Sequence, residues 1–557
     1  MKEKLLLVLI IILAVFLRFW EIETIPPSLS WDEVAIGYNA YSVLKTGKDE
    51  YGTSYPLLFR SFDDSKLPGL IYLTSVSEVI FGLNEFGVRF PSAFFGILTV
   101  LIAYFVVREI LEEKSALFAT LLFAINPWLI NFSRQAFETN VSMSFFSLGI
   151  LFLLKALRKR TMLVLSFAFF AVSIYFYYAA RIVVPFFILA FVTVNFNWFR
   201  KNFKIFLISG IIFIILLAPL IEPIFSTKGF SRINQVAITN EPYYLALKEN
   251  YAKLILDHDN VWWAKIVYNR RIAFFQTWFL NYVKNTSFEY LFVNGAGNTG
   301  LLYFWELPFF LLGFYALAVR REKWKYVILF WFVLSIIPAS FTKDQPNPLR
   351  TLIGAPSLVL ISFFGIKKAW EIAVLKKKTQ IFSVVLFMMI TASLVQFCFL
   401  YFEYAPKERA IDFGDGYKQL VQSLVKERKN YDLIYISGAY WRPYIHLLFH
   451  LKYDPMLYQA NGTKDGFDKF RFGKASWDSD GIDLQGADLA SLAPKEKKVL
   501  FVFSKKEFAG KVDPKINFAE AWPINGLYAK EVFWAFEYND YLRYLNLVKE
   551  TKEQNAF

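Results

Sequence analysis

The chain has 557 residues, of which 56% are hydrophobic and 19% aromatic, and its formal net charge is +14. This is too apolar for a soluble protein, and several apolar stretches of about 17–22 residues are long enough to cross a bilayer. The single cysteine, Cys398, excludes an intramolecular disulfide and a cysteine metal site. We therefore expect a polytopic α-helical membrane protein. We expect no nucleic-acid partner, because the positive charges fall in short loops between apolar segments.

The apolar segments predict about eleven membrane-spanning helices. The first follows Lys2 and Lys4 and has no small-residue cleavage site after it, so we interpret it as an uncleaved span that begins inside. The predicted spans are residues 5–20, 92–107, 115–130, 141–157, 162–178, 182–198, 203–221, 301–319, 326–341, 351–366 and 381–402.

Basic residues mark the loops that we predict to be cytoplasmic, namely 158–160, 200–204, 320–323 and the pair 367–368 with 376–378. The loop 108–114 is an exception, because its glutamates cancel its basic residues. The remaining loops include two long ones, 21–91 and 222–300, which we place outside. An odd number of spans also places the C-terminus outside. We expect a multi-pass plasma-membrane protein with its functional loops and C-terminal domain outside the cytoplasm.

The outer loops and the C-terminal part contain further predicted elements. Short amphipathic runs at 34–44, 70–81, 243–256 and 262–281 suit helices at the membrane surface. After residue 402 the composition becomes that of a soluble protein. Predicted helices at 417–428 and 443–451 alternate there with predicted strands at 432–437, 498–503 and 528–537. We therefore expect a transmembrane domain at 1–402 and a small α/β domain at 403–557.

Two adjacent carboxylates, Asp32 and Glu33, follow the first predicted span. Carboxylates near hydrocarbon are costly unless they are paired or used. Ser30 and Glu33 have the spacing of a capping box, which can account for Glu33. The capping box does not account for Asp32, whose charge in a first helical turn is stabilised by the helix dipole. We hypothesise that this pair serves catalysis on a lipid-carried substrate.

Several cations lie at the outer ends of predicted spans. Lys66 follows Asp63 and Asp64. This cluster is either a solvated turn, or a site in which the two acids hold the lysine in place to bind a phosphate. Arg134 and Glu138 are four residues apart, so they either pair on a helix or bind phosphate or sugar. Arg181 and Arg350 could each snorkel toward lipid headgroups. Several such residues on one face favour a phosphate-binding site.

These motifs give the first 400 or so residues a resemblance to the GT-C superfamily of polyprenyl-phosphate-sugar-dependent glycosyltransferases. The chain most resembles the bacterial protein O-mannosyltransferase and aminoarabinose transferase group. The residues that carry the resemblance are Trp31-Asp32-Glu33, Lys66-Leu67-Pro68, Arg89-Phe90-Pro91-Ser92, Phe132-Ser133-Arg134 with Glu138, the segment 175–181 with Pro185, Glu306-Leu307-Pro308 and Asn347-Pro348-Leu349-Arg350.

The resemblance implies an inverting transferase whose sugar donor is carried on polyprenyl phosphate. It makes Asp32 the catalytic aspartate and lets Lys66 and Arg134 meet the phosphate of the sugar donor. Two departures are Leu67, where the family often has a second proline, and Glu138, where some relatives carry Asp.

We accordingly predict a set of site residues and partners. The predicted catalytic carboxylates are Asp32 and Glu33, and the predicted substrate-binding residues are Lys66, Arg89, Arg134, Glu138, Arg181 and Arg350. The acceptor would be a hydroxyl of a lipid, a glycan or a protein, and membrane lipids surround the chain. We assign no metal site and no cofactor, and we leave a divalent metal open.

Two other functions compete with this hypothesis. A transporter or flippase of a lipid-linked saccharide also needs an outward cavity with cations, but it is expected to show internal repeats or charged, broken helices at the midplane. A non-catalytic scaffold gives the acidic pair no role. The charges of this chain lie at outer span ends, which favours chemistry at the membrane surface.

Overall fold

The structure is a computed structural model that describes residues 2–62, 64–226, 235–440, 442–473, 492, 497–504 and 522–540. Its contacts divide the chain into two compact units. Unit 1 comprises Met1–Trp20, Leu57–Leu70 and Pro91–Tyr401, and unit 2 comprises Glu21–Pro56, Ile71–Phe90 and Phe402–Phe557. Each unit is described by itself below.

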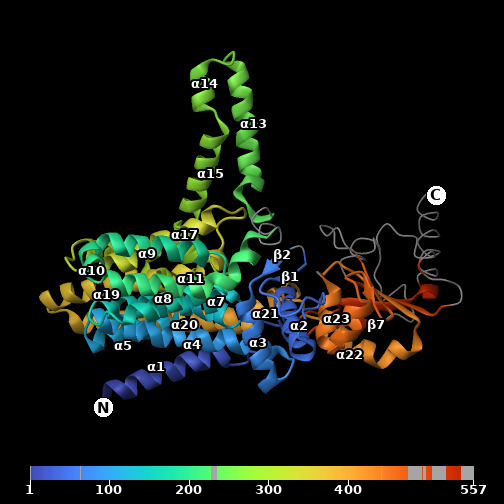
Figure 1. Cartoon of the computed structure of the whole chain (residues 1–557). Helices are drawn as coiled ribbons and strands as arrows, with labels where there is room; N and C mark the ends of the chain where they lie inside the picture. The colour runs from blue at the N-terminus through green and yellow to red at the C-terminus, as the bar shows by residue number, and fades with distance from the viewer. Residues whose placement is uncertain are drawn as a thin grey trace, which may run out of the picture. The chain divides into compact units, whose positions relative to one another are not determined.

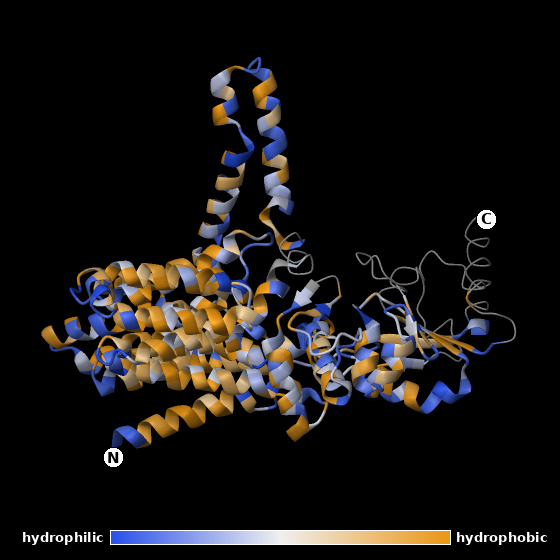
Figure 2. Ribbon diagram, viewed as in Figure 1, coloured by the Kyte–Doolittle hydropathy of each residue, from blue (hydrophilic) through white to orange (hydrophobic). Residues whose placement is uncertain are grey.

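Unit 1 is a bundle of apolar helices, visible as the largely orange part of Figure 2. Large buried side chains such as Trp128, Phe146, Phe170 and Trp331 fill its core. Its helices are α1 (Lys2–Phe19), α4 (Glu85–Ile110), α5 (Glu113–Ile125), α6 (Pro127–Ser133), α7 (Glu138–Ala156), α8 (Met162–Ile174), α9 (Ala180–Val194), α10 (Phe196–Lys201), α11 (Phe203–Phe225), α16 (Leu307–Ala318), α17 (Lys325–Ser340), α18 (Pro348–Thr351), α19 (Ala355–Leu375) and α20 (Thr379–Cys398).

Every predicted span coincides with one or two of these helices. By length and composition, however, only five helices of the described residues can cross a membrane, or six if the bent pair α5 and α6 is one span. The helices α8, α9, α16 and α17 are apolar but shorter than the roughly 17–25 residues of a regular span. The apolar helices support a membrane protein, and the count of eleven spans stays a prediction.

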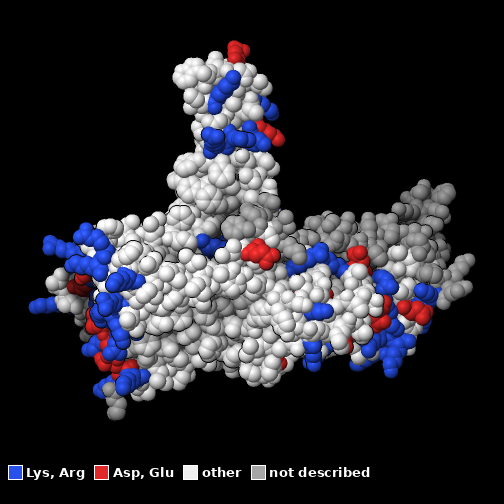
Figure 3. Space-filling view, in the orientation of Figure 1, with Lys and Arg blue, Asp and Glu red and all other residues white. Residues whose placement is uncertain are grey.

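Basic side chains collect at one end of the unit 1 bundle. Figure 3 shows Lys and Arg gathered where α5, α10 and α19 lie in Figure 1. Contacts link the predicted cytoplasmic loops there: Arg158 pairs with Glu109, Lys367 pairs with Glu112, and Lys323 donates to the Val194 carbonyl. The loops that we predicted to be cytoplasmic therefore share one end of the bundle, although the side of the membrane on which this end lies stays a prediction.

A helical arm projects from the bundle of unit 1 (Figure 1). It is formed by α13 (Pro242–Asp257), α14 (Trp262–Val267) and α15 (Arg270–Lys284), and α13 packs against α15. The sequence predicted one helix over 262–281, but the helix is broken before α15. Asn269 caps α15 by accepting hydrogen bonds from the next turn, so the chain starts a new helix there.

Unit 2 contains α2 (Trp31–Thr46), α22 (Tyr417–Glu427) and α23 (Pro443–Leu451), with a mixed sheet of six strands among its described residues. The strand order is β4 (Gly466–Phe467), β5 (Phe470–Phe472), β3 (Leu433–Ile436), β6 (Val499–Ser504), β8 (Phe533–Glu537) and β7 (Trp522–Ile524). The central strand β3 is parallel to β5 and β6, and β8 is antiparallel to β6. The helices and strands predicted from the sequence after residue 402 are present, with ends shifted by up to five residues.

The remaining elements are short or connect the two units along the chain. They are α3 (Pro68–Phe81), α21 (Ala405–Glu408), α24 (Pro455–Asn461), β1 (Phe59–Ser61), β2 (Asp64–Lys66), η1 (Ile238–Asn240), η2 (Tyr290–Asn294), η3 (Phe304–Glu306), η4 (Leu352–Gly354), η5 (Phe399–Tyr404), η6 (Ile411–Phe413) and η7 (Arg428–Asn430).

The first outer loop and the C-terminal part of the chain pack together within unit 2. Helix α2 lies against α23, and a Cβ built on Gly37 would be 2.6 Å from the Phe449 ring. Only glycine fits this approach without a shift of its neighbours. Residues 21–56 and 71–90 thus cluster with the C-terminal part. The predicted division into domains at 1–402 and 403–557 stays a prediction.

Candidate active site

The predicted capping box at the start of α2 is confirmed. The Ser30 side chain accepts a hydrogen bond from the backbone N–H of Glu33, and the Glu33 carboxylate accepts one from the backbone N–H of Ser30 at 3.0 Å. Both contacts satisfy N–H groups that a helix leaves without an internal partner. Glu33 therefore helps to start the helix that carries Asp32.

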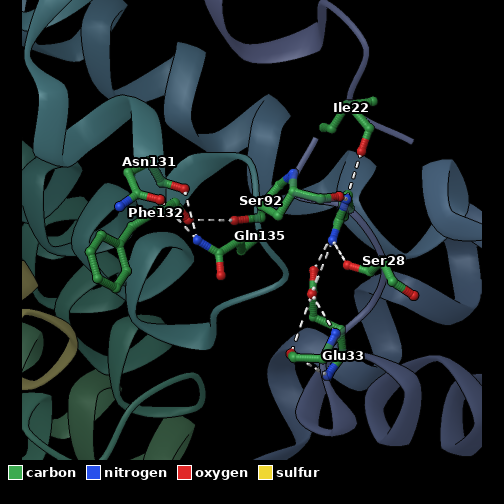
Figure 4. Close-up of polar contacts among 10 residues, drawn as sticks. Ile22, Ser28, Glu33, Ser92, Asn131, Phe132 and Gln135 are labelled. Carbon is green, nitrogen blue, oxygen red and sulfur yellow. Dashed lines mark hydrogen bonds and ion pairs between the residues drawn. The ribbon is translucent and has the colours of Figure 1, made fainter. Parts of the chain in front are cut away.

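Glu33, labelled in Figure 4 together with Ile22 and Ser28, also forms a buried ion pair with Arg89. The Arg89 guanidinium donates to the Glu33 carboxylate at 2.9 and 3.2 Å. It also donates to the backbone carbonyls of Ile22 at 2.8 Å, Pro26 at 2.9 Å and Ser28. Both charged side chains are fully buried, so the pair depends on these additional hydrogen bonds to offset the cost of desolvation.

These contacts make Glu33 and Arg89 structural residues of unit 2. Arg89 ties the loop before α2 to the start of α4, and Glu33 links Arg89 to the first turn of α2. The predictions that Glu33 is catalytic and that Arg89 binds substrate stay untested. In the proposal below, the proton is therefore assigned to Asp32 alone.

Asp32 lies in the first turn of α2 and is only partly buried, whereas its neighbour Glu33 is fully buried. The capping-box hydrogen bonds between Ser30 and Glu33 fix the backbone of this first turn. This arrangement presents a carboxylate on a fixed backbone, which is what a general base requires.

Lys66 and Glu138 form an ion pair in unit 1, with 3.5 Å between Lys66 Nζ and Glu138 Oε1. Lys66 ends the strand β2, and Glu138 is the first residue of α7. Their side chains keep 10% and 13% of their surface exposed. Of the two acids that we expected to hold Lys66, Asp63 lies outside the described residues and the side chain of Asp64 is not described.

The segment that carries Lys66 is anchored to the start of α9. The Tyr178 hydroxyl donates to the Ser65 carbonyl at 2.9 Å, and the Gly69 N–H donates to the Tyr175 carbonyl at 3.1 Å. Arg181 stacks on the Tyr178 ring with 4.4 Å from its guanidinium carbon to the ring centre. Tyr178 therefore links the Lys66 segment to Arg181, and the N-termini of α7 and α9 both belong to this group of residues.

Arg134 does not pair with Glu138 as one helix would allow. Helix α6 ends at Ser133 and α7 begins at Glu138, so the two residues lie on different helices. Arg134 is fully buried and donates to the carbonyls of Leu17 at 3.1 Å and Trp20 at 2.6 Å. The interpretation as a helical i,i+4 pair is wrong, and the phosphate role of Arg134 stays a prediction.

Arg350 belongs to the short helix α18, which Asn347 caps. Its guanidinium donates to the Thr342 hydroxyl at 2.8 Å and to the Lys343 carbonyl. These contacts close the turn between α17 and α18. Whether Arg350 also meets a substrate is untested.

Two buried polar links of unit 1 were missed by the sequence analysis. Asn140 of α7 donates to the Ser92 carbonyl of α4 at 2.7 Å. The Ser92 hydroxyl donates to the Phe132 carbonyl, as Figure 4 shows. Arg18, fully buried, donates to the Ala124 carbonyl at 3.0 Å. The signal was present, because an amide or a guanidinium inside an apolar segment needs a partner.

No group of three or more His, Cys, Asp or Glu side chains that could hold a metal ion occurs within the described ranges.

Comparison with known proteins places this geometry in a fold. A sequence model of the family described as dolichyl-phosphate-mannose-protein mannosyltransferase matches residues 65–221. That segment contains Lys66, Arg89, Arg134, Glu138 and Arg181. Curated protein sequences give no match.

Solved structures give a broader match. ArnT from Cupriavidus metallidurans, in the apo state and bound to undecaprenyl phosphate, matches with a TM-score of 0.57 and 12% identity over 95% of this chain and 97% of ArnT. The chain has the GT-C fold. An Archaeoglobus fulgidus oligosaccharyltransferase tethered to an acceptor peptide with the NVT sequon matches with a TM-score of 0.51 and 14% identity, over 80% of this chain and 63% of that one. The likeness predicted from the motifs is therefore confirmed at the level of the fold.

Proposed function

We propose that this protein is an inverting glycosyltransferase that moves a sugar from a polyprenyl-phosphate donor to a hydroxyl acceptor on the outer face of the membrane. The observation that carries the proposal is the Lys66–Glu138 pair, which lies inside the segment that matches the mannosyltransferase family. The two side chains are mostly buried but keep 10% and 13% of their surface exposed, and we infer that the Lys66 ammonium can meet a second anion there. An ammonium binds phosphate as a point charge.

The ArnT structure with undecaprenyl phosphate supports the class of the lipid carrier. That structure shares its fold with this chain over nearly the whole length of both proteins. We infer that the lipid carrier of this protein is also a polyprenyl phosphate. The sugar and the acceptor are left to experiment.

The proposed reaction is a single displacement at the anomeric carbon. The acceptor oxygen forms a bond to that carbon, and the bond from the carbon to the phosphate oxygen breaks. The leaving group is the polyprenyl phosphate, whose negative charge Lys66 stabilises, with Arg181 and Arg134 as further candidates. Asp32 takes the proton of the acceptor hydroxyl as general base. One displacement inverts the anomeric configuration, since no covalent enzyme intermediate forms.

The test is a product assay with purified full-length protein. A polyprenyl phosphate that carries a radiolabelled sugar is incubated with hydroxyl acceptors of the three classes, namely lipids, glycans and peptides. The proposal expects label on one acceptor, with inverted configuration and release of polyprenyl phosphate. Lys66→Ala should lose this product, and Lys248→Ala on the exposed face of α13 should keep it.

The alternative function, a transporter or flippase, predicts a different result. In sealed vesicles, the labelled lipid would then change leaflets while the sugar stays on its carrier. That outcome would overturn the transferase proposal.

A further inference from the structure

A groove opens at the basic end of unit 1, on α5, α19 and α20. It encloses about 540 Å³, within the range of roughly 300–1,000 Å³ that small-molecule sites occupy. Its walls are mostly apolar and aromatic, with Phe118 of α5, Phe363 and Trp370 of α19, and Phe382 and Leu386 of α20 among them. The groove has the shape and chemistry of a site for an acyl chain.

Helix α20 leaves this groove accessible from the side. Only 6% of the apolar window in the Thr379–Glu408 segment is buried, against 89% for Pro348–Leu375. Trp370 and Phe387 expose 42% and 69% of their surface at the groove. In a bilayer, such surfaces face hydrocarbon, so a lipid chain can enter without crossing water.

One end of the groove is polar. It is lined by Glu112, Lys114, Ser115 and Lys367. Lys367 Nζ lies 2.7 Å from the Glu112 carboxylate and 3.0 Å from the Ser115 hydroxyl. The hydrogen bond from Lys367 is the largest of the effects that lower the pKa of Glu112 to about 2. This carboxylate is therefore charged, and it offsets part of the positive charge of Lys367.

The lining itself is nevertheless positive, with Lys114 and Lys367 against Glu112. Lys114 is exposed and adds a second cation to the lining. The turn between α19 and α20 adds the exposed lysines 376–378 close to the groove in sequence. Basic pockets between membrane helices next to apolar surface suit the headgroups of anionic lipids.

We propose that this groove binds one anionic phospholipid, with an acyl chain against α20 and the phosphate at Lys114 and Lys367. The site is separate from Lys66 and Arg181, which are residues of other elements, and it does not depend on the proposed function. The occupant is a diacyl lipid with a negative headgroup and not a polyprenyl-phosphate sugar. It would anchor the α19–α20 hairpin to the inner leaflet, if the basic end is cytoplasmic as predicted.

The test is native mass spectrometry of the full-length protein in detergent. An equimolar mixture of phosphatidylglycerol and phosphatidylcholine with identical acyl chains is added as the probe. We expect the wild-type protein to retain phosphatidylglycerol by at least about fivefold over phosphatidylcholine, the weight of one basic residue near an anionic headgroup. Equal retention of the two lipids overturns the proposal, and this measurement needs no variant.

Three variants locate the lipid. Lys114→Gln with Lys367→Gln should abolish the preference. Lys159→Gln with Arg160→Gln, which removes the same charge from exposed positions outside the groove, should preserve it. Ser383→Trp, at an exposed groove position of α20, should fill the apolar part and also prevent retention. An equal loss in the control pair, or full retention in Ser383→Trp, shows that the lipid binds elsewhere and overturns the proposal.

Discussion

The Glu33–Arg89 pair of unit 2 and the Lys66–Glu138 pair of unit 1 have the same chemistry but different surroundings. The first has a 2.9 Å contact between two fully buried side chains, and Arg89 also donates to three backbone carbonyls. The second has a 3.5 Å contact, and both side chains keep some exposed surface.

This difference separates a structural ion pair from a candidate ligand site. A buried charge must have its hydrogen bonds satisfied within the protein, so Arg89 has little capacity left for a substrate. The Lys66 side chain keeps a small exposed surface beside a longer contact, and we propose that its ammonium can also meet a phosphate. The experiments below test whether the two pairs differ in this way.

The largest expected effect separates the two neighbouring carboxylates. Asp32→Asn removes the proposed general base and should cut turnover by roughly 10²–10⁴ while the protein stays folded and binds the sugar donor. Glu33→Gln should instead lower stability, because the amide keeps the capping contact with Ser30 but loses the ion pair with Arg89. Initial rates of transfer, with thermal unfolding as the control, measure both. A folded Glu33→Gln protein without transfer activity, beside an active Asp32→Asn protein, would show that the base is Glu33.

The second expected effect concerns the buried pair itself. Arg89→Ala leaves the Glu33 carboxylate buried without its cation, and should lower the free energy of unfolding by about 3–5 kcal/mol. Lys45→Ala, at an exposed position of α2, should change it by less than about 0.5 kcal/mol. Denaturant unfolding in detergent compares the two variants. An Arg89→Ala protein of normal stability with weakened binding of the sugar donor would make Arg89 a substrate residue.

The third expected effect is on binding of the sugar donor at the Lys66–Glu138 pair. Lys66→Ala removes a charge-assisted contact to phosphate worth about 1.5–3 kcal/mol, so affinity should fall roughly 10- to 150-fold. Lys66→Arg should recover only part of it, because a guanidinium differs in shape from an ammonium. Equilibrium binding of a labelled polyprenyl-phosphate sugar measures this, with Lys248→Ala as the matched control. Unchanged affinity in Lys66→Ala removes Lys66 from the site.

The last expected effect is a dependence on pH and concerns Glu50, a buried carboxyl of unit 2. Burial raises the pKa of Glu50 from 4.5 to about 8. The folded protein therefore binds a proton that the unfolded chain releases, and stability should fall as pH rises from about 4.5 to 8.

Glu50→Gln tests this pH dependence, because the amide cannot ionise. Melting temperatures of wild type and variant should approach each other near pH 5, and the variant should be the more stable protein at pH 8. Parallel melting curves across this range would mean that Glu50 is ionised in the folded state and has a partner that offsets its charge.

Local patterns in the sequence predicted much of the helical structure. The capping box of Ser30 and Glu33 and the helix at 443–451 depend on neighbours along the chain, so they could be predicted residue by residue. The apolar segments also located the helices of unit 1, because each apolar run must be buried in protein or lipid. The number of spans could not be predicted equally well, since helices such as α8 and α16 have 13 and 12 residues and their length alone does not show whether they cross the membrane.

By itself, the sequence determined the membrane class of this protein, its helical segments and the motifs that resemble GT-C glycosyltransferases. Only the tertiary structure decided the partners of the charges. Glu138 pairs with Lys66 and not with Arg134, because α6 ends before α7 begins and the strand β2 brings a lysine from 72 positions earlier in the chain. Arg89 pairs with Glu33 and not with the adjacent Asp32, because the capped turn of α2 directs Glu33 into the interior. Charge pairing acts through space, and contacts between distant segments are fixed only when the helices pack.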